Sequence, residues 1–256
     1  MPAPSTGPAC IPFTDYASSV PAAMDAIGAA AALADRELVL IKPNLVEAAP
    51  HPVTTPAACV EALIGWIRTH ADPRIVIGEG TGAADYDTQH CFDELGYTAL
   101  AARSDVELLD LNHAPCVEHR RDDCSFLPTC HLPQIAFEAL LISVPVLKAH
   151  SLAMVTGSLK NMMGLAPPLY YQQGGHWKKS AFHREMHRAI IELNRYRSPD
   201  LSLIDASIGL SEYHLGGPTC EPPVQRLIAG FDTLAVDRAA AEALGIDWRS
   251  VPHLAD

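Results

Sequence analysis

Short runs rich in β-branched residues and leucine recur along this chain, and helix-like segments separate them. The runs are almost continuously apolar, which indicates strands buried on both faces. They occupy residues 37–42, 74–80, 105–111, 139–146, 201–206 and 224–230. Segments that are rich in alanine or carry apolar residues at helical spacing occupy residues 17–34, 55–69 and 180–196. This alternation predicts an α/β fold in which helices flank both faces of a mainly parallel sheet.

The spacing of these segments also suggests how the chain is organised. Two stretches without regular periodicity, residues 112–133 and 167–180, are predicted to be insertions over a rigid frame. The proline-rich start, residues 1–15, is expected to be loose. The remainder, residues 16–256, is expected to form a single domain. If that domain has two lobes, they cover residues 16–145 and 146–256.

The charge of the chain limits its partners. Eighteen basic residues against thirty acidic ones give a formal net charge of -12, which disfavours nucleic acid and anionic membranes. No apolar run approaches the roughly 20 residues needed to cross a bilayer, and the start does not resemble a secretion signal. A cytoplasmic protein with a small anionic molecule as its partner is expected. A homo-oligomer and a redox partner both remain open.

Polar side chains follow two of the predicted strands. Lys42 and Asn44 flank a proline, so that both side chains are expected to leave the same face of the chain. Lys148 and His150 repeat this arrangement after a second buried strand. Open α/β sheets bind ligands at the carboxyl ends of their strands. These four residues are therefore predicted to line a ligand site.

The segment after His150 is polar within an apolar neighbourhood. Thr156, Ser158, Lys160 and Asn161 lie where a helix could begin, and free N–H groups, hydroxyls and a lysine would be available to an anion there. The segment is not a P-loop, because the glycine spacing and the Gly-Lys-Ser/Thr ending are missing. The alternative is a capped core helix.

Several long segments together resemble one known family. They read IKPNLV, GEGTG, VPVLKAHSLAMVTGSLKNMMGL, LSLIDASIGLSEYHLGGP and GFDTLAVDRAAAEALGI. In this order they are similar to the family called domain of unknown function 362, over about residues 30–250. The biochemical role of that family is unsettled. Some members add a ferredoxin-like module, which this sequence does not contain, so an iron–sulfur cluster is not expected within it.

The resemblance also implies which polar positions belong to the family's pattern. Its basic and amide positions fall on Lys42, Asn44, Lys148, His150, Lys160 and Asn161. Its acidic positions fall on Glu79, Asp205, Glu212, Asp232 and Asp237.

The carboxylates have different expected roles. Asp205 ends a predicted strand and is expected at the same edge as the lysines, as a base, metal ligand or counter-charge. Asp232 is predicted to cap the helix that follows it. Asp237 lies in the first turns of that helix, where a carboxylate is either a ligand group or a partner of the helix dipole. Glu212 precedes a glycine-rich turn that permits close approach to a ligand.

Two groups of residues could hold a divalent metal. His183 and His187 lie four apart on a predicted helix, with His176 nearby, although the zincin pattern is absent. The second group contains thiols and one imidazole. Its members are Cys116, Cys124, Cys130 and His131, at spacings that match neither a zinc ribbon nor a ferredoxin.

These observations support two hypotheses. In the first, the chain is an enzyme in which Lys42, Lys148 and Lys160, with the two asparagines, hold a carboxylate or phosphate. His150 and Asp205 then move protons, with Lys148 as a further catalytic group. In the second, the chain is an accessory or electron-transfer protein with a metal or iron–sulfur centre. The sequence identifies neither the substrate nor the reaction.

Overall fold

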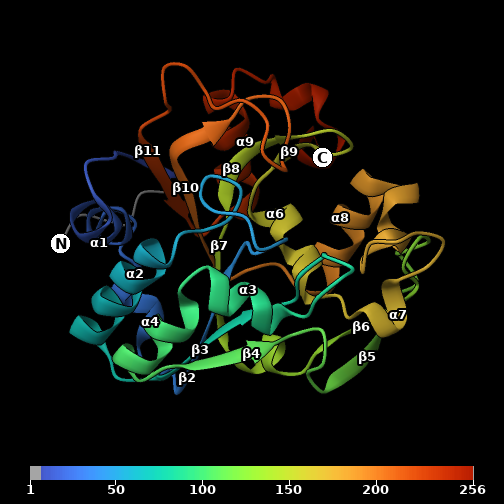
Figure 1. The fold of residues 1–256 in the computed structure, drawn as a ribbon, viewed down its shortest axis with the longest axis horizontal. Coiled ribbons are helices and arrows are strands. Elements are labelled where there is room, and N and C mark those ends of the chain that lie inside the picture. Colours follow the sequence, from blue (N-terminus) through green and yellow to red (C-terminus); the bar gives the residue numbers. More distant parts are fainter. Residues whose placement is uncertain (1–6, 256) are drawn as a thin grey trace.

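Parallel strands form the centre of a nine-stranded sheet in the computed structural model, which describes residues 7–255 (Figure 1). The main order is β1 (Ala9–Pro12), β11 (Arg226–Gly230), β10 (Leu201–Leu210), β7 (Leu140–Val144), β2 (Leu38–Pro43), β3 (Arg74–Glu79) and β4 (Glu107–Asp110). Two further strands, β8 (Val146–His150) and β9 (Met154–Thr156), extend the sheet beside the second half of β10.

The strand directions confirm the predicted sheet. β2 is parallel to β3 and β7, β3 is parallel to β4, and β10 is parallel to β7 and β8. Antiparallel pairing occurs where β11 joins β10 and β1, and where β9 joins β8. The carboxyl ends of β2, β3 and β8 therefore lie at one edge of the sheet.

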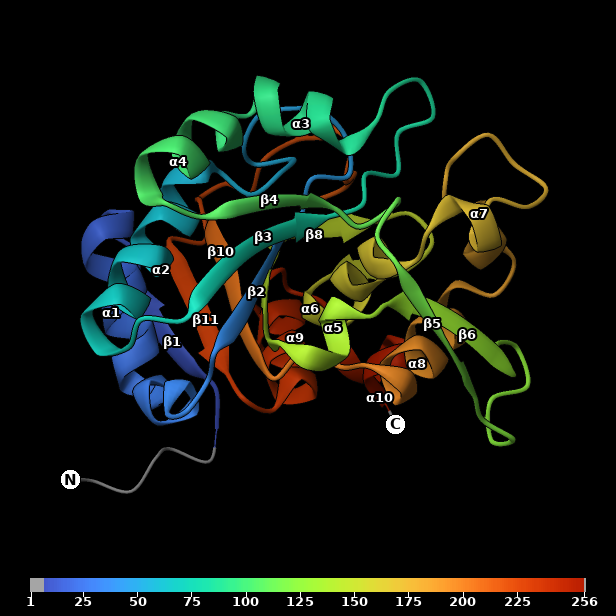
Figure 2. The same ribbon diagram turned by 90° about the horizontal axis from the view of Figure 1, so that it is seen from below.

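Helices cover both faces of the sheet, as predicted (Figure 2). One face packs against α1 (Tyr16–Ala26), α2 (Ala57–His70), α3 (Thr88–Glu94) and α4 (Tyr97–Ser104). The other packs against α5 (Ile135–Glu138), α6 (Ser158–Asn161), α7 (Pro168–Tyr171), α8 (Met186–Tyr196), α9 (Thr233–Ala243) and α10 (Pro252–Ala255). Short 3₁₀ helices span Ala29–Leu33, Met162–Leu165, Ser180–Arg184 and Trp248–Ser250. Within residues 7–255, no helix is both long and apolar enough to span a membrane.

Side-chain alternation along β2 determines which of its residues point toward α6. Val39 and Ile41 belong to the core beneath α1 and α2, whereas Leu40 belongs to the core on the α6 side. Successive residues of a strand point to opposite faces. Lys42 therefore projects to the same side as Leu40, toward α6, at the carboxyl end of the strand.

The structure differs from the sequence-based expectations in three places. Residues 112–133, predicted to be an insertion loop, contain a β-hairpin, β5 (Cys116–Arg120) with β6 (Thr129–Pro133). The cysteines and charges there obscure the β pattern. Part of the segment predicted to be loose forms β1, which pairs with β11, while residues 1–6 lie outside the described part. Finally, β10 continues to Leu210, four residues beyond its predicted end.

Candidate functional site

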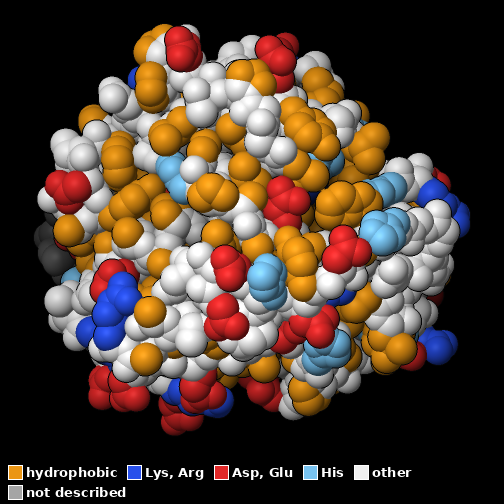
Figure 3. All heavy atoms as spheres, viewed as in Figure 1, with side chains coloured by type: hydrophobic (Ala, Val, Ile, Leu, Met, Phe, Trp, Pro, Cys, Tyr) orange, Lys and Arg blue, Asp and Glu red, His pale blue; other side chains and the backbone are white. Residues whose placement is uncertain are grey.

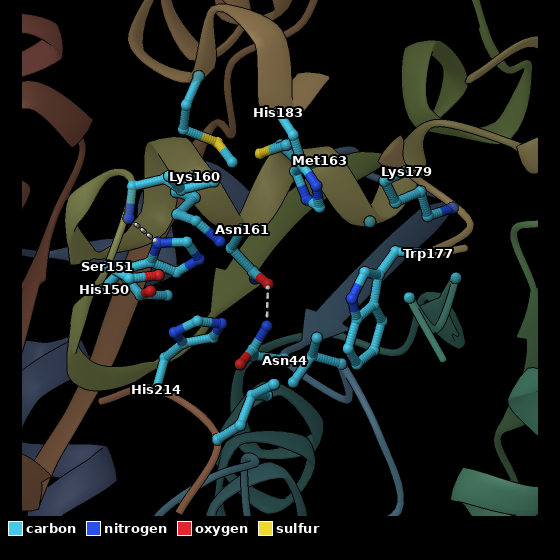
Figure 4. A pocket seen from close by; sticks show the side chains of 18 of the residues that line it. Asn44, His150, Ser151, Lys160, Asn161, Met163, Trp177, Lys179, His183 and His214 are labelled. Atoms are coloured by element: carbon cyan, nitrogen blue, oxygen red, sulfur yellow. Dashed lines mark hydrogen bonds between the residues drawn. The ribbon is translucent and has the colours of Figure 1, made fainter. Parts of the chain in front are cut away.

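A cavity of about 280 Å³ lies at the carboxyl edge of the parallel strands. Residues after β2 and β3 form one side of it, and the turn after β8 with α6 forms another. The segments around Trp177–His183 and Tyr213–Leu215 complete the wall. Figure 4 shows these side chains converging from separate parts of the chain, and Figure 3 shows hydrophobic and histidine side chains on one face of the molecule. Open α/β sheets bind ligands in this position.

Lys42 and Glu79 form a buried ion pair beside the cavity, which Glu79 lines. Lys42 Nζ lies 2.8 Å from Glu79 Oε1, and the two side chains are 0% and 2% exposed. Burial lowers the pKa of Lys42, and the adjacent carboxylate opposes that change. Glu79 also accepts hydrogen bonds from the backbone N–H groups of Leu45 and Gly80. Lys42 does not line the cavity, so the structure gives it a supporting position rather than the predicted ligand-binding one.

Two asparagines connect this ion pair to the cavity wall. Asn161 Oδ1 accepts hydrogen bonds from Lys42 Nζ at 3.1 Å and from Asn44 Nδ2 at 3.3 Å. Asn44 Oδ1 and Thr156 Oγ1 are buried atoms without a hydrogen-bond partner in the described chain, and both residues line the cavity. An unpaired buried polar atom costs about 1–3 kcal/mol. Such atoms are typical of sites that receive a ligand.

Lys160 is the one lysine without a partner in the described part of the chain. Lys148 Nζ donates to Val53 O at 2.6 Å, Lys178 Nζ donates to Tyr86 O, and Lys179 Nζ donates to Asn112 and Ala166. Lys160 Nζ makes no hydrogen bond or ion pair with residues 7–255, although it lines the cavity. Burial and the nearby Lys42 charge lower the pKa of Lys160 to about 8. At neutral pH this ammonium is mostly charged, and no carboxylate among residues 7–255 pairs with it.

Two stacked histidines lie on the other side of the cavity. The rings of His150 and His214 are 3.7 Å apart between centroids, and both line the cavity. His150 Nδ1 accepts hydrogen bonds from the backbone N–H groups of Leu152 and Ala153, each at 3.1 Å. The neutral ring must then carry its proton on Nε2. Burial and the Lys160 charge lower the pKa of both histidines, that of His214 to about 3, so both rings are neutral at pH 7.

The three histidines considered as metal ligands do not come together. His183 lines the cavity, His187 Nδ1 lies 2.8 Å from His253 Nδ1, and the exposed His176 lies 3.7 Å from Asp85. Among residues 7–255, the one set of three metal-ligating groups with mutually close donor atoms is Asp87, Asp110 and His113. The predicted trio therefore fails because its histidines belong to separate clusters. The thiols of Cys116, Cys124 and Cys130 also form no such set there.

Asp205 and Lys148 lie outside the cavity lining as well. Asp205 is in the middle of β10 and accepts hydrogen bonds from the Tyr16 hydroxyl at 2.7 Å and the Ser207 N–H at 2.9 Å. Although burial opposes ionisation, His51 and the hydrogen bonds from Ser207 hold the pKa of Asp205 below its usual value. The longer strand explains the misplacement, because Asp205 does not end it. Burial and the Lys160 charge lower the pKa of Lys148 to about 7, but its ammonium points to Val53 O.

The remaining predicted residues have structural partners or point elsewhere. Asp237 accepts hydrogen bonds from the backbone N–H groups of Ser158 at 2.7 Å and Leu159 at 2.9 Å, at the start of α6. Asp237 therefore caps α6 rather than α9, the helix to which it belongs. The N–H groups that were expected to bind an anion already donate to its carboxylate. The Ser158 hydroxyl is buried without a partner in the described chain, but Ser158 does not line the cavity. Glu212 is exposed and also outside the cavity lining.

The Asp237 cap leads to a stability prediction. Asp237→Asn is expected to lower the free energy of unfolding by about 1–3 kcal/mol, because one of the two backbone N–H groups at the start of α6 loses its acceptor. Each carboxylate oxygen accepts one N–H, whereas an amide offers a single acceptor oxygen. Asp232→Asn is the matched control, because Asp232 caps α9 through Ala235 N and asparagine caps equally well. Equal urea midpoints for the two variants would contradict this account.

Sequence reasoning did not identify several residues that line the cavity, among them His214, Trp177 and Tyr213. All three lie in irregular segments, where neither periodicity nor strand ends predict a position. The basic character of the stretch around Lys179 was visible in the sequence. Lys179 reaches the cavity wall because its buried ammonium binds Ala166 O and Asn112 Oδ1.

Comparisons with known proteins give a family and a fold. The model of the DUF362 family, a domain of unknown function, matches residues 39–242. No curated protein matches the sequence. Among solved structures, the chain is similar to the lactate racemase apoprotein from Thermoanaerobacterium thermosaccharolyticum, with a TM-score of 0.52 and 15% identity. The match covers 91% of this chain but 55% of that protein, and at this identity it supports the fold alone.

Proposed function

The chain belongs to the DUF362 family, and we propose that it is an enzyme that binds a small carboxylate in the cavity beside Lys160 and transfers a proton on it. The observation that carries this proposal is the unpaired Lys160 ammonium. A charged group in a partly buried position is stabilised when an opposite charge reaches it. The other four lysines already have protein acceptors, so a ligand anion is the partner that Lys160 lacks.

The surroundings of Lys160 favour a carboxylate over a phosphate. A phosphate carries up to two negative charges and is usually held by several cations or by free N–H groups at a helix start. Here Asp237 uses the N–H groups of Ser158 and Leu159 at the start of α6. One free ammonium matches the single charge of a carboxylate. The protein with a similar fold is named for lactate, which is also a small carboxylate.

The histidines supply the means to move a proton. His183 lines the cavity, and burial together with the Lys160 charge lowers its pKa, so that its ring is free to accept a proton at neutral pH. His150 is a hydrogen-bond donor instead. Its Nδ1 already accepts two backbone N–H groups, so its proton is on Nε2. His183 would take a proton from the carbon next to the carboxylate while His150 and Lys160 stabilise the negative charge that develops.

Hydrogen exchange in heavy water tests this function. A panel of 2-hydroxy carboxylates is incubated with the protein in D₂O, and proton NMR follows loss of the signal from the hydrogen on the carbon next to the carboxylate. At least one acid is expected to exchange with wild type and at least tenfold more slowly with His183→Gln. His187→Gln is the control, since His187 pairs with His253 outside the cavity. If no acid in the panel binds or exchanges, the proposed function is wrong.

The Lys160 pKa predicts how ligand affinity depends on pH. The charged ammonium binds the carboxylate, so affinity is expected to fall as the pH rises through the Lys160 pKa of about 8. Well above that pKa, the fall approaches tenfold per pH unit. Lys160→Arg should retain binding at pH 9.5, because a guanidinium stays charged there. Calorimetric titration at several pH values measures both effects, and a pH-independent wild-type affinity would contradict the assignment of Lys160.

A further inference from the structure

Large apolar side chains are exposed together at the mouth of the cavity. Leu152, Trp177 and Tyr213 are 46%, 36% and 45% exposed, and all three line the cavity. They belong to three segments that are far apart in the sequence. Exposed apolar groups that gather in one place mark an interaction surface, whereas scattered ones do not.

The cavity wall between this mouth and Lys160 is also partly apolar. Met163 and Met186 are 7% and 5% exposed and line the cavity, together with Val46 and Leu215. Methionine side chains adapt to irregular apolar ligands. Figure 4 shows Trp177 across the cavity from His150 and His214. The cavity therefore combines a polar region around Lys160 and the histidines with an apolar region around Trp177.

The volume of the cavity gives an independent indication of ligand size. At about 280 Å³ it lies near the lower end of the range for pockets that hold drug-sized ligands, about 300–1,000 Å³. That is more space than a three-carbon acid fills. A ligand that used both regions would need an anionic head and an apolar body.

We infer that the carboxylate ligand carries an aromatic or branched aliphatic group, which packs against Trp177 while the carboxylate binds Lys160. This inference rests on the proposed function and specifies its substrate class. Trp177 is then the residue that selects for the apolar group. Leu152 and Tyr213 line the same cavity and shield it from water, which strengthens the attraction between the carboxylate and Lys160.

Calorimetry with three 2-hydroxy acids of increasing apolar size tests the inference. The acids are lactate, 2-hydroxy-4-methylpentanoate and 3-phenyllactate. Burial of a leucine or phenylalanine side chain corresponds to a gain of about 10- to 100-fold in affinity, so both larger acids are expected to bind that much more tightly than lactate. The ratio of the 3-phenyllactate and lactate affinities is the quantity compared among variants.

Trp177→Ala is expected to reduce this ratio to within about threefold of unity. Trp248→Ala is the matched control, because Trp248 packs between Arg238 and Arg249, outside the cavity lining, and its loss should leave the ratio unchanged. Equal binding of lactate and 3-phenyllactate by wild type, or an unchanged ratio in Trp177→Ala, overturns the inference and leaves the proposed function standing. Failure of all three acids and of the wider carboxylate panel overturns both.

Discussion

Lys42→Met is expected to lower the free energy of unfolding by about 3–5 kcal/mol, the largest stability effect that we predict. The substitution removes the partner of Glu79, whose side chain is 2% exposed, and leaves a buried carboxylate without a counter-ion. Two backbone N–H groups still bind Glu79, but they do not supply a full positive charge. Urea denaturation followed by circular dichroism measures the change.

A second variant separates the ion pair from simple loss of packing. In the double variant Lys42→Met with Glu79→Gln, no uncompensated charge remains, and the loss of stability is expected to be smaller than in Lys42→Met alone. If the double variant is the less stable of the two, the charge is not the cause. A change below about 1 kcal/mol in Lys42→Met would show that the ion pair does not support this edge of the sheet.

Lys160→Met is expected to differ from Lys42→Met, because it should weaken carboxylate binding strongly without any loss of stability. Loss of the ammonium should weaken carboxylate binding by at least about 30-fold, which corresponds to about 2 kcal/mol. The free energy of unfolding should stay unchanged or rise, because an unpaired and partly buried charge is removed. Calorimetry and urea denaturation of the same preparation measure the two quantities.

Lys178→Met is the matched control for this binding test. Lys178 lies outside the cavity lining and donates to Tyr86 O and Asp87. The control should bind the carboxylate as wild type does. If Lys160→Met is destabilised as strongly as Lys42→Met, Lys160 has a structural role and is not the ligand-binding cation.

Lys42 and Lys160 illustrate which features of the site the sequence could predict and which it could not. The strand runs and their order predicted the parallel sheet, because a buried strand must be apolar on both faces and little else in a sequence has that character. The same runs placed Asn44 and His150 at the carboxyl edge of the sheet, where the cavity lies. The sequence could not distinguish the lysine that meets a carboxylate from the one that meets none, since their partners are distant in the chain.

Other differences have equally local causes. Asp205 appeared to end a strand because a polar residue follows an apolar run, but hydrogen bonds to Tyr16 and Ser207 allow the strand to continue through it. Asp237 lies in α9 yet caps α6, a contact between helices that no spacing rule predicts. Trp177 and His214 reach the cavity from irregular segments, so tertiary structure alone reveals their position.

The central claim, that Lys160 is a perturbed and unpaired cation awaiting an anion, is tested most directly by carbon NMR of protein labelled at lysine Cε. The chain has five lysines, and Lys160→Met identifies the resonance of interest. We expect Lys160 to titrate with a pKa of about 8 in the free protein and at a higher pH when the cavity is saturated with carboxylate. A Lys160 pKa near the ordinary value of about 10.4, unmoved by every carboxylate added, would contradict the account.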